Sequence, residues 1–465
     1  MLTNTELTQE YLDVIASLDG DMEGRRAAAD YMAHSTAIVH GVHVANSCVP
    51  RLFNDRTYEA MKECAETAHT VLVKVMQRYL DDPDYRDVFD YDERLRDLIL
   101  IPRRYESVLP FARVDTFMNE DDYTFKFCEF NGDGSAGMNE NREITLSVVR
   151  TPAFRKFTER HRIESCEIFN QWVEEFIGIY ETFENRVNNP RFAIADYLDH
   201  GVVDEFRHFA RLFKYRGYPC EVVDVRELTF DGKVLRSKDG NRIDAIWRRC
   251  VTNDVLEFWD QSQDLIEAVR AGKVALIGSF AGHIIHDKQI FKALFHPKTR
   301  EFLTPEEAAW VDATVPRTAF LCDDEIDIQM VRENKDDWII KPTDNYGAAD
   351  VYAGCQVSQE EWEAVVDRFA NGAAGAPFIV QTYITPYKTL TLPYETPQDL
   401  VEPKEPQFEL YNNLNGLYLL NGKFGGVFSR LGPLPTICKQ MGGITSASIW
   451  VHEDLEEGED EAEQA

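Results

Sequence analysis

Four polar side chains stand at alternate positions in two neighbouring β-rich runs. The first run, FARVDTF, carries Arg113 and Asp115, and the second, YTFKFCEF, carries Glu129 and leads into Asn131. Residues two apart in a β-strand point to the same face, so both pairs can face one site. Two carboxylates and an amide carbonyl are oxygen ligands of the kind Mg²⁺ prefers, and the arginine could neutralise a phosphoryl group in transfer. An exposed strand face whose charges only pair with one another is an equally open interpretation.

The glycines after the second run spell Gly132-x-Gly134-x-x-Gly137, which matches the dinucleotide-binding fingerprint. That fingerprint also needs a second parallel strand and an acidic residue about 20 positions on. Here the apolar spacing instead predicts helix as far as Phe183. We therefore interpret these glycines as a turn at the end of a strand.

Two lysines further along the chain occupy positions that an anion would explain. Lys341 ends the apolar run WIIKP, where a buried ammonium group is costly, and Lys288 opens a predicted helix, where the helix dipole disfavours it. A phosphate could meet both, with Gly347 in a loop whose backbone N–H groups fold over a triphosphate although the P-loop arrangement is missing. Taken alone, Lys341 is also compatible with a strand-end lysine that reaches solvent.

The segment FIVQTYITPYKT is predicted as a strand that leads into a bend. Such a bend could hold an adenine against backbone groups and the apolar side chains of Val380 and Ile384, which makes Gln381, Tyr383 and Ile384 candidate nucleotide-binding residues.

Two further pairs of residues leave their roles open. His283 and His286 are three apart, but no third metal ligand follows from spacing, so structural histidines with satisfied hydrogen bonds are the preferred interpretation over zinc. Arg248 and Arg249 could bind a substrate carboxylate or could cap a strand with solvated charge.

The elements that position these residues fall into successive segments. Helical spacing, clearest in Tyr58–Tyr79, predicts a helical N-terminal region, and a long helix is predicted from Phe154 to Phe183. Alternating strands and helices then predict a small parallel sheet, and β-rich runs with an Asn421-Gly422 hairpin predict a largely antiparallel one. The predicted segments are 1–95 (helical), 96–188 (hairpin and helices), 189–272 (parallel α/β), 273–452 (nucleotide-binding) and 453–465 (acidic disordered tail).

The composition excludes several classes of protein. The 465 residues are 44% hydrophobic, enough for a sizeable core, and the net charge of −32 argues against a nucleic-acid partner. No apolar run approaches the roughly 20 residues of a membrane span and no export signal is apparent, so a cytoplasmic location without a membrane partner is expected. Nine scattered cysteines without a C-x-x-C motif predict reduced thiols.

Taken in order, ARVDTF…FKFCEFNGDG, DGNRIDAIWRR, HDKQIF, WIIKP and NGKFGGVFSRLG resemble the circularly permuted ATP-grasp family typified by the synthetase domain of glutathionylspermidine synthase. The resemblance runs from about Tyr31 to Trp450 and implies an α/β fold, with a permuted ATP-grasp core, a small parallel-sheet pre-ATP-grasp domain and a helical N-terminal region. It implies Mg²⁺ on Asp115, Glu129 and Asn131, Arg113 as the residue that steadies the phosphoryl group, and ATP phosphates on Lys288 and Lys341.

The same resemblance implies an ADP-forming ligase that activates a small carboxylate as an acylphosphate and joins it to an amine. The family pattern E-x-N-x-D is followed by threonine or proline, whereas this chain continues Asp133-Gly134-Ser135, and no amidase domain is seen, so the substrates stay open. An inactive ATP-binding regulatory protein and an ATP-dependent small-molecule kinase are the alternatives. The sequence does not indicate an oligomeric state.

Overall fold

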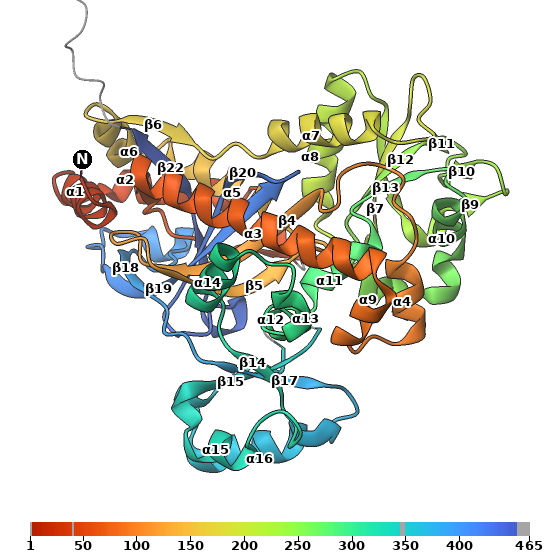
Figure 1. Cartoon of the computed structure of the whole chain (residues 1–465). Helices are drawn as coiled ribbons and strands as arrows, with labels where there is room; N and C mark the ends of the chain where they lie inside the picture. Colours follow the sequence, from red (N-terminus) through yellow and green to blue (C-terminus); the bar gives the residue numbers. More distant parts are fainter. Residues whose placement is uncertain (1, 40, 345–348, 453–465) are drawn as a thin grey trace, which may run out of the picture.

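The computed structural model describes residues 2–39, 41–344 and 349–452 and contains a large antiparallel sheet (Figure 1). Its strand order is β21-β20-β19-β4-β5, with β18 paired to β19. Two distant parts of the chain therefore build one sheet, because the hairpin near residue 120 pairs with strands that follow residue 380. The strands are β4 (Phe111–Met118), β5 (Phe125–Asn131), β18 (Lys388–Thr391), β19 (Glu409–Leu420), β20 (Lys423–Gly432) and β21 (Ile444–Ser446).

Both hairpins predicted in this sheet are confirmed. Asn421 and Gly422 join β19 to β20 with φ values of +51° and +87°, the left-handed conformation that a two-residue type I′ turn requires. In the other hairpin, Arg113 of β4 lies opposite Asn131 of β5, and Asp115 lies opposite Glu129. The four polar residues of the sequence pattern are thus neighbours across two strands.

One long helix, α3 (Asp55–Asp81), packs against the large sheet. Its apolar residues recur three and four apart, so Met61, Ala65 and Leu72 share one buried face with sheet residues such as Val114 and Leu417. The predicted helix at Tyr58–Tyr79 is confirmed, but short strands interrupt the rest of the N-terminal region. The other elements there are α1 (Asn4–Ala16), α2 (Met22–Met32), β1 (Ile38–Val39), β2 (Val42–His43), β3 (Arg51–Asn54) and α4 (Glu93–Ile99).

The predicted parallel sheet has the order β13-β12-β7-β8, and all its pairings are parallel. Alternate residues enter two cores, since Ile194 and Trp247 pack with α7 and α8 while Ala193 and Ile246 pack with α10. Its elements are α7 (Phe169–Glu181), β7 (Phe192–Asp196), α8 (Val203–Tyr215), β8 (Cys220–Asp224), β12 (Ala245–Arg248), α9 (Thr252–Glu257), α10 (Gln263–Arg270) and β13 (Ala275–Ile277), with a meander of β9 (Thr229–Phe230), β10 (Leu235–Arg236) and β11 (Arg242–Ile243).

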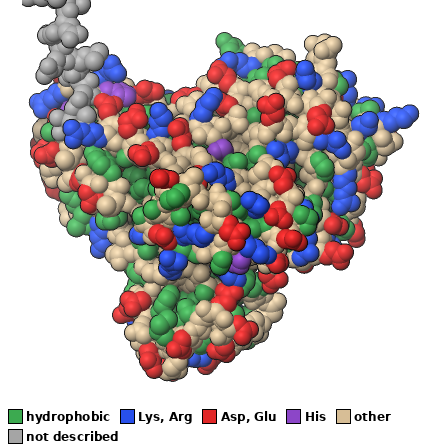
Figure 2. Space-filling view, in the orientation of Figure 1, with side chains coloured by type: hydrophobic (Ala, Val, Ile, Leu, Met, Phe, Trp, Pro, Cys, Tyr) green, Lys and Arg blue, Asp and Glu red, His purple; other side chains and the backbone are tan. Residues whose placement is uncertain are grey.

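A smaller lobe hangs below the large sheet in Figure 1 and stands out in the space-filling view of Figure 2. It consists of an antiparallel sheet of order β14-β17-β15-β16 covered by two helices, with Ile340, Trp362 and Val380 in its own core. On the face that Figure 2 shows, acidic and basic side chains are interspersed. The elements are β14 (Thr318–Phe320), α15 (Ile328–Glu333), β15 (Trp338–Pro342), β16 (Tyr352–Ala353), α16 (Gln359–Phe369) and β17 (Phe378–Thr382).

The predicted long helix from Phe154 to Phe183 is wrong. A strand, β6 (Arg162–Ser165), splits it into α6 (Pro152–Thr158) and α7, because β6 pairs with β22 (Ser448–His452) near the other end of the chain. Amphipathic spacing cannot reveal such a long-range pairing. The remaining α-helices are α5 (Met138–Val148), α11 (His283–His286), α12 (Gln289–Ala293), α13 (Pro297–Arg300) and α14 (Pro305–Thr314).

No helix of the described chain is both long and apolar enough to cross a membrane. All nine cysteines are free thiols, as expected. The segment boundaries drawn from the sequence stay predictions, and the acidic residues 453–465 lie outside the described residues.

Candidate functional site

A cavity of about 630 Å³ opens where the large sheet, the small lobe and the parallel sheet meet. It gathers most of the candidate residues, although they come from segments far apart in the chain. Asp115 is not among its lining residues, and Gly347 lies outside the described residues. The candidates that line it are Arg113, Glu129, Asn131, Lys288, Lys341, Gln381, Tyr383 and Ile384.

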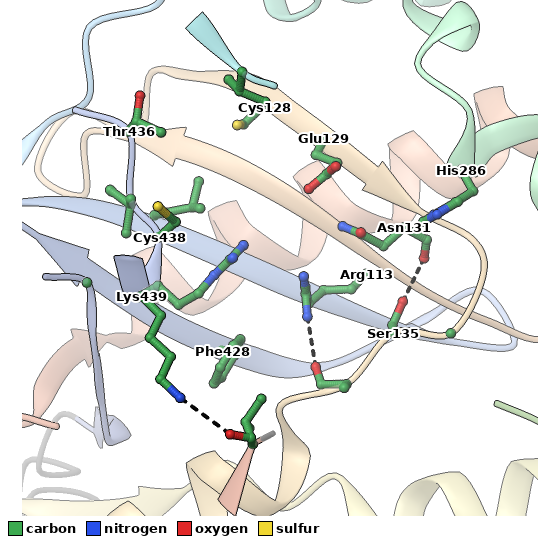
Figure 3. Close-up of a pocket in the computed structure, with 18 of the residues that line it drawn as sticks. Arg113, Cys128, Glu129, Asn131, Ser135, His286, Phe428, Thr436, Cys438 and Lys439 are labelled. Carbon is green, nitrogen blue, oxygen red and sulfur yellow. Dashed lines mark hydrogen bonds between the residues drawn. The ribbon is translucent and has the colours of Figure 1, made fainter. Parts of the chain in front are cut away.

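The hairpin β4–β5 forms one wall of this cavity. Figure 3 shows the side chains of Glu129, Asn131 and Arg113 lying next to one another along this wall. Arg113 donates to the carbonyl oxygen of Ala136 at 2.8 Å, and Ser135 donates to the carbonyl oxygen of Asn131 at 2.9 Å, so the glycine-rich loop is fastened to the wall (Figure 3). That loop is a turn after a strand, as interpreted from the sequence.

Asp115 lies beneath the cavity surface and is fully buried. Its carboxylate accepts hydrogen bonds from Nε and Nη2 of Arg113, at 2.7 and 3.2 Å, and a third from Arg430 of β20. A carboxylate offers about four acceptor positions, so three of them are taken. In this arrangement Asp115 orients two arginines, and its predicted contact with Mg²⁺ stays a prediction.

Glu129 and Asn131 offer oxygen atoms to the cavity in a way that fits Mg²⁺. The Glu129 side chain is 26% exposed and faces the cavity, while Asn131 is 9% exposed and its Nδ2 atom has no hydrogen-bond partner among the described residues. An unpaired amide N–H donor of this kind suits an acceptor such as a phosphate oxygen, while the carbonyl oxygen of the same side chain is the atom that a metal ion would take. A carboxylate and an amide oxygen are the hard donors that this ion takes.

Lys288 approaches the same wall from the segment between α11 and α12. Its ammonium group lies 3.2 Å from the carboxylate of Glu129. Burial alone would raise the pKa of Glu129, but the charges of Lys288, His286 and Lys341 lower it to about 2. Glu129 is therefore an anion at neutral pH, as a metal ligand must be.

Lys341 enters the cavity from β15 of the small lobe. Its ammonium group donates to Oε1 of Gln381 on β17 at 3.0 Å, and Gln381 in turn donates to Thr318 at 2.9 Å. Burial lowers the pKa of Lys341 from its ordinary value. An anion placed here would favour the charged ammonium form, which agrees with the phosphate interpretation and not with a lysine that reaches solvent.

Only one of the two apolar side chains predicted to contact the adenine lies at the cavity, and its contact with adenine stays a prediction. Ile384 lines the cavity, but Val380 is fully buried in the lobe core with Trp362. Side chains alternate along β17, so placing Gln381 in the cavity turns Val380 away from it. Ile339, which lies opposite Gln381 on β15, lines the cavity instead.

The far end of the cavity lies at the carboxyl ends of the parallel strands, where α/β sheets commonly bind ligands. Asp196 ends β7 and Glu140 belongs to α5, and both line the cavity. Burial raises the pKa of Asp196 to about 7 although Arg249 lowers it, and burial together with the charge of Glu205 raises the pKa of Glu140 to about 7. The cavity is thus lined by two carboxyl groups whose pKa values lie near neutrality.

The two adjacent arginines have different surroundings. Arg248 does not line the cavity and bonds Asp133 together with the carbonyl oxygens of Gly278, Cys250 and Ser279. Its role is therefore structural. Arg249 lines the cavity and pairs with Glu205 at 3.2 Å, while its Nε atom has no hydrogen-bond partner among the described residues.

The hydrogen bonds expected for His283 and His286 as structural histidines are largely missing among the residues that the structure describes. Both ring nitrogens of His283 and Nδ1 of His286 are buried without a hydrogen-bond partner in the described chain. The group of described residues that could hold a metal ion does not contain His286: His283, Asp287 and Asp344 place one donor atom each within 4.8 Å of one another. Spacing could not find Asp344 because it belongs to another segment.

Sequence reasoning missed several residues of the cavity. The carboxylate of Asp196 directly after the apolar run FAIA was an available signal, because strand ends of parallel sheets carry ligand-binding residues. In the sequence, Arg430 stands only at the end of a predicted hairpin, and no local pattern marks Glu140 or Lys439. The ammonium group of Lys439 donates to the carbonyl oxygen of Val39 at 3.3 Å (Figure 3).

Comparison with solved structures supports this fold. A glutathione synthetase-like effector from Globodera pallida, in its apo form, is similar over 92% of this chain and 96% of that chain, with a TM-score of 0.57 and 10% identity. A protein described as a gamma-glutamylcysteine synthetase from Methylobacillus flagellatus KT gives a TM-score of 0.40 at 12% identity over 80% and 87% of the chains. The D-cycloserine synthetase DcsG gives 0.29 at 18% identity over 42% and 59%. Only the first score establishes a common fold.

No curated protein sequence matches the chain. The family model for circularly permuted ATP-grasp type 2 matches residues 139–413, which include both lysines and β17 but begin after the β4–β5 hairpin. This match covers more than half of the 465 residues. The chain therefore belongs to the circularly permuted ATP-grasp type 2 family.

Proposed function

We propose that the chain is an ATP-dependent ligase that joins a small carboxylate to an amine through an acylphosphate and releases ADP and phosphate. The observation that carries this proposal is that one cavity brings together two kinds of side chain. Lysines and the β4–β5 hairpin line it, and so do carboxyl groups with raised pKa values. A nucleotide and an amine can be held there at the same time.

At the nucleotide end, Lys288 and Lys341 bind the phosphates of ATP. Lys341 is held in place by Gln381, so little side-chain entropy is lost when the phosphate arrives. Ile339 and Ile384 contact the adenine, and backbone groups at Gln381 and Tyr383 form hydrogen bonds with the edge of the adenine ring. Gly347 is proposed to belong to the loop over the phosphates.

Glu129 and Asn131 hold Mg²⁺, with Asp115 behind them. When bound, the ion supplies positive charge that offsets the charge of the phosphate oxygens. Asp115 keeps the guanidinium groups of Arg113 and Arg430 fixed beside this position. Preorganised cations stabilise developing charge without reorganisation during the reaction, and this is the contribution that we assign to both arginines.

In the proposed reaction a carboxylate oxygen of the acid attacks the γ-phosphorus of ATP, and the bond from that phosphorus to the β-γ bridging oxygen breaks, which leaves ADP. The amine nitrogen then attacks the acyl carbon, the bond between that carbon and the phosphate oxygen breaks, and phosphate leaves. The nitrogen must lose a proton in this second step. Asp196 and Glu140, with pKa values of about 7, are suited to bind the protonated amine and to accept that proton.

The test is ADP release by the purified protein with ATP, Mg²⁺ and pooled small acids and amines, with mass spectrometry for a condensed product. An amide formed together with ADP supports the ligase, and a stable phosphorylated acceptor indicates a kinase. Binding of ATP without turnover in every pool would contradict the proposal and favour the regulatory alternative. Glu409, at the start of β19, carries an exposed carboxylate. Glu409→Gln is therefore the matched control for Glu129→Gln.

A further inference from the structure

A second group of metal-ligating side chains lies beside the proposed nucleotide end. His283 begins α11, Asp287 follows this helix directly, and Asp344 stands two residues after the end of β15. His283 and Asp287 are four residues apart, so they lie on the same side of one helical turn. The group therefore connects α11 with the strand that carries Lys341.

The distances in this group are unsuited to hydrogen bonds. Nε2 of His283 lies 3.6 Å from Oδ2 of Asp344 and 3.9 Å from Oδ2 of Asp287. A hydrogen bond would need a shorter contact. Two ligand atoms that each lie about 2.1 Å from a tetrahedral metal ion are roughly 3.4 Å apart, so the observed spacing is close to that of atoms that share an ion.

Unpaired buried atoms point to a ligand at the same place. His283 is 1% exposed, yet neither of its ring nitrogens has a hydrogen-bond partner among the described residues. Nδ1 of His286 and the hydroxyl group of Tyr91, whose ring packs edge-on against His283, also lack a partner there. Buried polar groups are nearly always satisfied, so this concentration of exceptions needs a bound species.

A protonated imidazole does not account for the arrangement. An imidazolium ring would donate from both nitrogens, and neither nitrogen of His283 has an acceptor within hydrogen-bond distance among the residues that the structure describes. The nearby charges have other partners, because Lys288 pairs with Glu129 at 3.2 Å and Asp133 is held by Arg248 and Thr252. Two carboxylates and an imidazole nitrogen together offer the donor atoms that a divalent cation takes.

We propose that His283, Asp287 and Asp344 bind a divalent transition-metal ion, with Zn²⁺ as the best match. One nitrogen and two carboxylate oxygens suit Zn²⁺, whereas Mg²⁺ prefers oxygen ligands alone. This site is distinct from the proposed Mg²⁺ position on Glu129 and Asn131 and does not depend on the ligase reaction.

A cation at this site fixes the geometry of the cavity. It joins α11 to the residues after β15, in parallel with the hydrogen bond from the backbone amide of Lys288 to the carbonyl oxygen of Thr343 at 2.8 Å. Lys288 directly follows Asp287 in the sequence, and Lys341 shortly precedes Asp344. Loss of the ion is therefore expected to lower the thermal stability and to weaken nucleotide binding without removing any residue that contacts the nucleotide.

The experiment measures Zn²⁺ on the full-length protein after removal of metals with a chelator. Titration by calorimetry and elemental analysis are expected to give one tightly held equivalent per chain and an increase in the melting temperature. Co²⁺ in its place is expected to show the visible absorption of a tetrahedral or five-coordinate site. His283→Ala and Asp344→Asn are expected to weaken Zn²⁺ binding by more than roughly 100-fold, since even residues behind the ligands contribute up to that much.

Three control variants separate this site from other zinc-binding groups. Glu129→Gln tests the proposed Mg²⁺ position, Cys355→Ser tests the exposed thiol, and His34→Ala removes an exposed histidine. All three are expected to keep the tightly held equivalent. Asp344→Asn is expected to have the same melting temperature as metal-free wild type, which would show that the variant folds. The proposal is overturned if wild type retains no zinc, or if the two ligand variants retain it as wild type does.

Discussion

The ammonium group of Lys288 lies 3.2 Å from the carboxylate of Glu129, although one residue follows α11 and the other lies on β5. This contact joins a residue of the proposed Mg²⁺ position to a residue of the proposed phosphate position. Both groups line the same cavity, so the contact places the proposed metal ligand and the proposed phosphate ligand side by side.

Glu129→Gln is predicted to reduce ADP formation by about 100-fold or more while the protein stays folded. The amide keeps the size of the side chain but loses the charge that the metal ion needs, and the ion pair between residue 129 and Lys288 is lost. Steady-state rates and circular dichroism measure the two effects. Near-normal turnover in Glu129→Gln, with Glu409→Gln also normal, would remove Glu129 from the site.

The pH dependence of ATP use tests Lys341. Burial lowers the pKa of this lysine below its ordinary 10.5, and only the ammonium form below the pKa attracts phosphate. The value of kcat/KM for ATP is therefore predicted to fall on the alkaline side at a lower pH than an exposed lysine would give. In Lys341→Arg the guanidinium group stays charged, so this decline should disappear. An unchanged alkaline decline in the arginine variant would show that another group causes it.

Ile339 and Val380 form a matched pair on adjacent strands of the small lobe. Ile339→Ala is predicted to raise the KM for ATP several-fold with little loss of stability, because Ile339 lines the cavity. Val380→Ala is predicted to lower the free energy of unfolding by roughly 1–3 kcal/mol and to leave that KM unchanged, because it empties space in the lobe core. Denaturant unfolding and initial rates measure both, and the reverse pattern would place the adenine on the other face.

These two residues also show how far the sequence could predict the site. Composition correctly identified the strands, since short continuous apolar runs end at Lys341 and Gln381. The face was assigned wrongly for Val380, because a one-residue change of phase reverses every side chain of a strand and only the tertiary partner decides it. The hairpin with Arg113 and Glu129 was predictable because its pairing is local.

The remaining errors come from contacts between distant segments. Edge pairing of β6 with β22 replaced the middle of an apparent helix by a strand, which shows tertiary structure overriding local spacing. Only in the folded chain does Asp344 lie near His283, and only there do Glu140 and Asp196 line the same cavity. No separation along the sequence contains that information.

Asp196→Asn is predicted to stabilise the protein at pH 8 and to have little effect near pH 4. Burial raises the pKa of Asp196 from 3.8 to about 7, so the folded protein holds a proton that the unfolded chain releases between these values. The stabilisation from this proton is complete below pH 4 and is lost as the pH rises through 7. Asparagine resembles the protonated form at every pH and should increase the free energy of unfolding at pH 8 by roughly 1–4 kcal/mol.

The matched control for this prediction is Asp199→Asn. A hydrogen bond from Arg226 lowers the pKa of Asp199, so its removal should not stabilise the protein at pH 8. Urea unfolding at both pH values gives the comparison. An Asp196→Asn protein that is less stable than wild type at pH 8 would mean that the attraction of Arg249 for the charged carboxylate outweighs the cost of burying it, so that the fold does not raise the pKa of Asp196.

The most direct test of the ligase proposal follows the oxygen atoms of the acid. The purified protein is given ATP, Mg²⁺, the amines of the productive pool and the acid labelled with ¹⁸O in its carboxylate, and the phosphate is analysed by mass spectrometry. An acylphosphate transfers one labelled oxygen to phosphate when the amine displaces it, so phosphate with one ¹⁸O and ADP in equal amount are predicted. Unlabelled phosphate, or AMP with pyrophosphate, would contradict the account.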